Sequence, residues 1–381
     1  MAKASKIEIE DDPLHPRKQA DLIGHAGAEG ALLAAWNSGR LPHAWLIAGP
    51  RGIGKATLAY RFARFALAGG AGGDASAGDG LFGAQPSPSG GGLAVSPDSA
   101  VFRRVAAGAH PDLLIVEKGV DPKNGREKSA IGVDEARAIG AFLSLTPAEG
   151  GWRVVVVDSA DEMTRNAANA MLKILEEPPS RSLLLLVCHA PGRIPSTVRS
   201  RCRRLQMSPL GDDDVATLLA RLLPDTADAE RLALARMGEG SIGRALALAE
   251  AGGLDLYREL LTFAGRLPSI DVAAAHTLAD KLGRAGANEA FAAFAELIGW
   301  WIARLVRLST RAAGPAPKPS AEVFPGEHAA LLKTAGLRRL DQWAEVWEKI
   351  ARLFGQGEGL HFDRKQMLLS ALMALEPDAR A

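Results

Sequence analysis

Four short runs of apolar residues stand out in the first 207 positions of the chain. They read AWLIA (44–48), DLLIVE (112–117), RVVVVD (153–158) and SLLLLVC (182–188). Their apolar residues follow one another without alternation, which is typical of parallel strands whose two faces are both covered by helices. The pattern predicts an α/β fold in which a parallel sheet lies between two layers of helices.

Helical periodicity fills the intervals between these runs. It predicts helices over Lys55–Leu67, Val133–Leu143 and Thr164–Glu176, the last ended by Pro178 and Pro179. Strands and helices that alternate in this way are the usual composition of a sheet with crossover helices.

The hydrophobic pattern changes after Pro209, where alanine- and leucine-rich helical segments continue to the end of the sequence. A chain of 381 residues is also long enough for two or three cores. We therefore expect an α/β domain over 1–207, a small helical lid over 208–255 and an all-α C-terminal domain over 256–381. The second boundary rests on Gly252 and Gly253, which interrupt the helical pattern.

A glycine-, serine- and proline-rich stretch follows the first predicted helix, over residues 69–92. Such a composition favours a flexible segment. We interpret residues 69–109 as an insertion in the α/β domain and predict that it is flexible.

The segment from Gly49 to Thr57, GPRGIGKAT, follows a predicted strand and opens a predicted helix. This is the context of a phosphate-binding loop, in which Gly49, Gly52 and Gly54 let backbone N–H groups face a phosphate and Lys55 reaches its outer oxygens. The alternative is an ordinary glycine-rich turn between strand and helix. The full spacing favours the phosphate loop.

Two groups that phosphoryl transfer needs are missing around this loop. Ala56 stands where a Ser or Thr hydroxyl would hold Mg²⁺, and Thr57 lies about 100° further round the helix. Asp158 ends a strand where a metal-binding carboxylate is expected, but the next residue is Ser159 in place of a catalytic glutamate. Bound ATP or ADP without turnover is compatible with this loop.

Asp161 and Glu162 follow Ser159 at the start of a helical segment. They could act as the base that Ser159 cannot supply, but a strand no longer fixes them, and solvated charges at a helix start need no catalytic role. We expect solvated charges.

Composition excludes several classes of protein. With 45 basic and 44 acidic residues, the net charge is +1 and indicates no general affinity for nucleic acid. The two cysteines, Cys188 and Cys202, are too few for a disulfide framework or a four-cysteine zinc site. We expect no secretory signal, no membrane span and a reduced, cytoplasmic compartment.

A local excess of arginine interrupts this neutral balance between positions 181 and 207, where no acidic residue occurs. The arginines are Arg181, Arg193, Arg199, Arg201, Arg203 and Arg204. A solvated basic face, or a patch that binds nucleic-acid phosphates, is the ordinary explanation for such a cluster.

Several segments together resemble the subunits of bacterial DNA polymerase III clamp loaders, which are AAA+ proteins. They are SGRLPHAW (38–45), IGVDEAR (131–137), NAMLKILEEPP (169–179) and the triplet Ser200-Arg201-Cys202. The resemblance is strong from about 23 to 250 and weak near FDRKQ (362–366). The family's zinc module of four cysteines is absent from the sequence, and no zinc is predicted.

Within this family, Ala56 and Ser159 favour the delta-prime type, which tends to lose its own active site. The resemblance implies that Arg201 is an arginine finger for ATP bound to a neighbouring motor subunit, and that the C-terminal helices form an oligomeric collar. It implies tau/gamma and delta subunits as partners, the sliding clamp and primed DNA as contacts of the complex, and membership of a DNA-directed DNA polymerase (nucleotidyltransferase) holoenzyme. We expect no intrinsic ATPase.

Three further positions carry weaker signals. Arg244 falls one place later than the family's second sensor arginine. Cys188 and His189, where a first sensor would lie, are expected to be packing residues and not metal ligands. The tryptophans of the last hundred residues, Trp300, Trp301, Trp343 and Trp347, are explained by a buried core or by an interface.

Two other functions stay open on the sequence alone. An active AAA+ ATPase, either a clamp-loader motor or a helicase-like enzyme, is opposed by Ala56, Ser159 and the displaced Arg244. A general DNA-binding module would use the arginine cluster.

Overall fold

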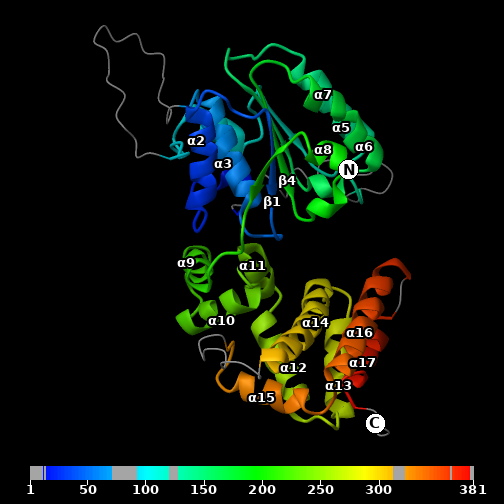
Figure 1. Cartoon of the computed structure of the whole chain (residues 1–381). Helices are drawn as coiled ribbons and strands as arrows, with labels where there is room; N and C mark the ends of the chain where they lie inside the picture. Colours follow the sequence, from blue (N-terminus) through cyan, green and yellow to red (C-terminus); the bar gives the residue numbers. More distant parts are fainter. Residues whose placement is uncertain are drawn as a thin grey trace. The chain divides into compact units, whose positions relative to one another are not determined.

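A computed structural model describes residues 12, 14–70, 92–119, 128–311, 322–360 and 363–377 of the chain (Figure 1). The chain divides into two compact units, Met1–Gly211 and Asp212–Ala381. This division, between Gly211 and Asp212, lies close to the predicted end of the α/β domain at 207. The lid boundary near 255 stays a prediction.

The first unit is built on a parallel sheet. Its strands, among the described residues, are β1 (Ala44–Ala48), β2 (Leu113–Val116), β3 (Arg153–Val157), β4 (Ser182–Cys188) and β5 (Arg203–Gln206). They are hydrogen-bonded in the order β2-β3-β4-β1-β5, and every pair is parallel. Because parallel strands all end at the same edge, the loops after β1, β3 and β4 meet there.

Helices cover both faces of this sheet (Figure 1). One face carries η1 (Pro16–Lys18), α2 (Ala26–Asn37), α3 (Lys55–Leu67) and α4 (Ala100–Ala106). The other carries α5 (Val133–Leu143), η2 (Ala160–Glu162), α6 (Arg165–Ala170), α7 (Leu172–Glu176), η3 (Pro191–Arg193) and α8 (Ser196–Arg199). Alternate residues of each central strand enter the two cores: Val154 and Val156 face α3, and Val155 and Val157 face α5. The predicted α/β fold is confirmed.

Two elements of the first unit differ from the sequence prediction. The helix predicted over 164–176 is divided at Met171 into α6 and α7. Strand β5 was not predicted, because its sequence RRLQ buries only Leu205 and carries three exposed polar side chains. An edge strand with one buried position gives no apolar run.

The predicted flexible insertion over 69–109 is wrong for its second part. Residues 71–91 lie outside the described residues, but Leu93 and Val95 are buried in the core beside α3. Helix α4 follows, capped by the Ser99 hydroxyl, which accepts the N–H of Phe102, and it buries Val105. The glycine-rich composition stops at residue 92, and a short amphipathic helix after it was overlooked.

The second unit is helical throughout its described residues. Its helices are α9 (Asp212–Leu222), α10 (Asp228–Gly238), α11 (Ile242–Glu250), α12 (Gly253–Gly265), α13 (Val272–Gly283), α14 (Asn288–Arg311), α15 (Glu327–Ala335), α16 (Leu340–Leu360) and α17 (Arg364–Met373). The expected helical second half is confirmed. None of the helices in the described part of the chain is long and apolar enough to cross a bilayer.

The tryptophans of this unit separate into core and surface. Trp301 of α14 and Trp343 of α16 are fully buried and meet edge to face, with ring centroids 6.0 Å apart. Trp300 is also buried, whereas Trp347 is 45% exposed. A buried core therefore explains three of the four rings, and Trp347 lies on the surface of α16.

Candidate functional site

The loop after β1 has the backbone of a turn that only glycine tolerates well. Gly52 and Gly54 have φ of 75° and 100°, and a Cβ on Gly49 would lie 2.5 Å from the carbonyl oxygen of Met207. His25, at the start of α2, supports the loop through a 2.6 Å contact between its Nε2 and the carbonyl oxygen of Ile53. The three glycines of this loop are thus required by its backbone, and its phosphate-binding role stays a prediction.

Lys55 opens α3 and is only 3% exposed. Its ammonium group donates a hydrogen bond to the carbonyl oxygen of Pro50. Burial lowers the pKa of Lys55 to about 8, although the nearby carboxylates of Asp158 and Asp161 oppose the shift. A lysine buried in this way costs stability unless an anion joins it, which is the condition that a phosphate would meet.

Ala56 and Thr57 lie in the first turn of α3, where the sequence analysis looked for a metal-binding hydroxyl. Ala56 packs its methyl group against the core beside β1 and has no oxygen to offer. Thr57 is the next residue of α3 and is half-buried. No group of three or more potential metal-ligating side chains occurs in the described ranges of the chain.

The ends of β3 and β4 bring Asp158, Ser159 and His189 to the same edge of the sheet as Lys55. Ser159 adopts a left-handed conformation with φ of 55°, and its Oγ lies 3.2 Å from Nε2 of His189. Burial, and then the positive charge of Lys55, lower the pKa of His189. The side chain that stands in place of a catalytic glutamate is thus engaged by a neutral imidazole.

The prediction that Asp161 is a solvated charge is wrong. Its side chain is buried, and its two oxygens accept the backbone N–H groups of His189 and Ala190 at 2.7 and 3.1 Å. Burial alone would raise the pKa of Asp161, but these hydrogen bonds hold it below its usual range. Asp161 fastens the end of β4 to the loop after β3, and Glu162 beside it pairs with Lys118 at 2.9 Å.

Cys188, the last residue of β4, is buried, and its burial raises the pKa of the thiol to about 12. A thiol that stays protonated at neutral pH is a poor metal ligand. Together with the Ser159 contact of His189, this geometry agrees with the expected packing roles of Cys188 and His189.

Arg201 lies apart from this edge, just beyond the C-terminal end of α8. Its side chain is 36% exposed and pairs with the carboxylate of Glu176, at the end of α7, at 2.7 Å. One nitrogen also donates to the carbonyl oxygen of Thr197 at 3.0 Å. The guanidinium is therefore accessible, and the carboxylate of Glu176 and the carbonyl oxygen of Thr197 orient it.

The other arginines of the cluster are exposed and have mainly local partners. Arg181 donates to the carbonyl oxygen of Gly150, Arg199 to that of Pro191, and Arg204 to the side chain of Gln206. Of these arginines, only Arg201 is paired with an acidic side chain of the same unit in the contacts that the structure describes. Glu176 was not singled out in the sequence because it belongs to another helix.

Arg244 belongs to the second unit and is held there by acidic side chains. Its Nη1 lies 3.2 Å from Glu239, and its Nε lies 2.7 Å from Glu296 of α14. Ser241 caps α11 by accepting the N–H of Arg244. The guanidinium of Arg244 therefore forms its ion pairs with carboxylates of its own unit.

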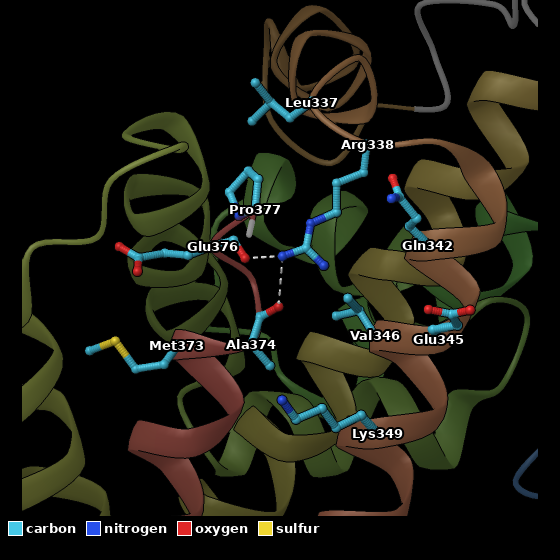
Figure 2. A pocket seen from close by; sticks show the side chains of 10 residues that line it. All are labelled: Leu337, Arg338, Gln342, Glu345, Val346, Lys349, Met373, Ala374, Glu376 and Pro377. Atoms are coloured by element: carbon cyan, nitrogen blue, oxygen red, sulfur yellow. Dashed lines mark hydrogen bonds between the residues drawn. The ribbon is translucent and has the colours of Figure 1, made fainter. Parts of the chain in front are cut away.

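A separate pocket opens among the C-terminal helices of the second unit (Figure 2). Arg338 extends into it and donates to the carbonyl oxygens of Ala374 and Glu376 at the end of α17. The carboxylate of Glu376 accepts the N–H of Ile270 at 2.7 Å. These bonds satisfy helix-end carbonyls, so Arg338 closes the end of α17.

Comparison with known proteins finds similarity to DNA polymerase III subunits over part of the chain. The family described as DNA polymerase III, delta subunit, matches residues 93–211. A DNA polymerase III subunit delta' of Pseudomonas aeruginosa is 36% identical over 184 residues, 48% of either chain. That of Escherichia coli is 35% identical over 219 residues, 57% of either chain. The chain spans about half the length of these relatives.

More distant matches extend the same comparison. A DNA polymerase III subunit tau/gamma of Haemophilus influenzae is 26% identical over 239 residues, 62% of this chain and 31% of its own. A solved structure, a DNA polymerase III gamma subunit-related protein of Thermotoga maritima, is 18% identical and covers 90% of this chain and 98% of its own, with a TM-score of 0.36.

Proposed function

The chain is a delta'-like relative of the DNA polymerase III clamp-loader subunits, and on this premise we propose that it is a non-hydrolysing member of such a complex. It completes the assembly that loads the sliding clamp onto primed DNA in the cytoplasm, and its partners are tau/gamma and delta subunits. It supplies Arg201 to ATP held by a neighbouring motor subunit.

The observation that carries this proposal is the contact between Ser159 and His189 at the edge of the sheet. Phosphoryl transfer depends on metal, on a positioned water and on charge neutralisation. With Ala56 in place of the metal-binding hydroxyl and Ser159 engaged by His189, one metal ligand and the group that would position water are missing, and Asp158 is left as the expected metal-binding carboxylate. Lys55 and the loop glycines retain the means to bind ATP or ADP without turnover.

The exposed position of Arg201 supports the second half of the proposal. A guanidinium paired with one surface carboxylate exchanges that partner for a phosphate at low cost, because exposed ion pairs contribute only about 0–1 kcal/mol. An arginine donated in trans to a γ-phosphate accelerates hydrolysis roughly 10³- to 10⁵-fold.

The rival function is an active AAA+ ATPase, and the purified chain distinguishes the two. We expect no Mg²⁺-dependent release of phosphate from ATP by the isolated chain, with or without primed DNA. As a control, the same preparation should restore turnover when it is mixed with tau/gamma and delta subunits. Metal-dependent turnover by the chain alone would reject the proposal.

A further inference from the structure

Glu239 is the residue that ends helix α10, and its backbone has the left-handed conformation of a helix C-cap. It follows α10 directly and has φ of 48° and ψ of 43°, the left-handed region that non-glycine residues seldom adopt. Gly240 beside it also has a positive φ, of 80°. Strain of this kind persists where the surrounding contacts require it, and it directs attention to what the side chain does.

The carboxylate of Glu239 is shared by two arginines from different helices. One oxygen lies 3.2 Å from Arg244 of α11, and the other lies 2.8 Å from Arg307 of α14. Arg244 in turn reaches Glu296 of α14 at 2.7 Å. The four side chains form a neutral chain of alternating charges, which is here named the Glu239 network.

Further contacts also connect α10 and α11 to each other and to neighbouring segments of the second unit. The guanidinium of Arg244 lies 5.7 Å from the ring centroid of Trp300, so α14 meets it with an aromatic face as well as a carboxylate. Arg236 of α10 donates to the carbonyl oxygen of Glu322, in the segment before α15. The end of α10 also packs closely on α11, since a Cβ on Gly238 would lie 3.0 Å from that of Ala245.

We propose that the Glu239 network locks helices α10 and α11 to α14, so that the region predicted as a lid and the C-terminal helices behave as one rigid body. In its left-handed backbone conformation, Glu239 presents its carboxylate to both arginines. Arg244 is therefore a positioning residue of the lock. The predicted boundary near residue 255 is not a hinge.

The test is hydrogen–deuterium exchange of the full-length chain, read separately for each helix. In the unaltered protein, amides of α10 and α11 should exchange in the same slow class as those of α14, as members of one cooperative unit. Glu239→Gln removes the charge that both arginines share. We expect exchange in α10 and α11 to become about 10-fold faster, with β3, β4 and α17 unchanged.

Two variants separate the lock from general stability. Glu250→Gln removes an exposed carboxylate from the same helix α11 and should leave exchange as it was. Glu239→Gly removes the carboxylate but also the left-handed strain, so its Tm should exceed that of Glu239→Gln by a few degrees, about 2–4 °C. Its α10 and α11 amides should nevertheless exchange as fast as in Glu239→Gln.

Salt supplies an independent reading of the same contacts. Raising NaCl from about 50 mM to 500 mM shortens the Debye length and should accelerate exchange of α10 and α11 more in the unaltered protein than in Glu239→Gln, which keeps only the Arg244–Glu296 pair of the network. Unchanged exchange of these helices in both Glu239 variants would overturn the proposal. So would an acceleration spread evenly over the whole chain, because Glu239 would then serve only overall stability.

Discussion

The loop edge of the sheet and the surface at Arg201 each carry a basic side chain, but Lys55 is buried and Arg201 is exposed. Lys55 is 3% exposed, and around it Ser159, His189 and Asp161 are bound to partners within the chain. The Arg201 side chain is 36% exposed and is held by one surface carboxylate and one backbone carbonyl oxygen. Both regions belong to the first unit. Ser159 and His189 lie in loops after strands of the sheet, and Lys55 opens helix α3. Arg201 lies just after helix α8.

The difference shows which of these groups can bind a partner outside the chain at low energetic cost. Buried polar groups that satisfy one another are costly to separate, because each group left without a partner loses about 1–3 kcal/mol. A guanidinium in a surface pair is released at little cost. The polar groups at the loop edge are therefore fixed within the chain, whereas the surface presents Arg201 as an accessible cation.

Removal of Asp161 should have the largest effect on stability. Asp161→Ala leaves the partly buried N–H groups of His189 and Ala190 without their acceptor, and we expect a loss of about 2 kcal/mol in the free energy of unfolding. Denaturant titration at neutral pH measures this loss. Asp134→Ala, which removes an exposed carboxylate from α5, should cost less than about 0.5 kcal/mol.

The stabilisation from Asp161 also has a defined dependence on pH. Because its folded pKa is lowered, the contribution is complete above the pKa of the unfolded chain and is lost as pH falls through the folded value. The gap between Asp161→Ala and the unaltered protein should thus close in acid. A small loss at neutral pH would contradict the internal fixation of this edge.

Lys55→Met should stabilise the protein without ligand, by on the order of 2 kcal/mol at pH 7. The folded pKa of about 8 lies below that of the unfolded chain, so the native state resists holding the proton. The penalty is present below about pH 8 and disappears as pH rises toward 10.5. Unfolding measured at pH 7 and pH 9.5 should therefore show a smaller advantage for the variant at the higher pH.

An equal advantage at both pH values would show that Lys55 is not a buried charge. A loss of stability in Lys55→Met at pH 7 would show that the Lys55 ammonium and its hydrogen bond to Pro50 stabilise the fold. Either result would remove the contrast between Lys55, whose burial lowers its pKa, and Asp161, whose carboxylate is stabilised by backbone N–H groups.

Sequence patterns predicted most of the sheet and the helices against it. The predicted strands over 44–48 and 182–188 and the helices over 55–67 and 133–143 coincide with β1, β4, α3 and α5. Each of these elements has a continuous apolar run or a clear amphipathic period. Strand β5, with one buried side chain, and the short helix α4 after a glycine-rich stretch lacked such a signal.

Pairings between distant positions were beyond the sequence. Asp161 was assigned to solvent because no neighbour in sequence holds it, whereas its partners lie 28 and 29 positions away at the end of β4. Ser159 and His189 each follow a buried strand, and that placement was the available signal for their contact. Glu176 beside Arg201 and Glu239 beside Arg307 depend on helix packing, which periodicity does not specify.

The central claim is that the chain contributes Arg201 to a neighbour's ATP while it hydrolyses none itself. Single-turnover ATP hydrolysis by the reconstituted complex tests it most directly, with Arg201→Ala beside Arg204→Ala and Glu176→Gln. The account predicts that the site completed by this chain slows about 10³-fold or more in Arg201→Ala. Arg204→Ala and Glu176→Gln should remain within about twofold, since a surface pair contributes at most about 1 kcal/mol. Unchanged single-turnover hydrolysis in a correctly assembled Arg201→Ala complex would contradict the claim.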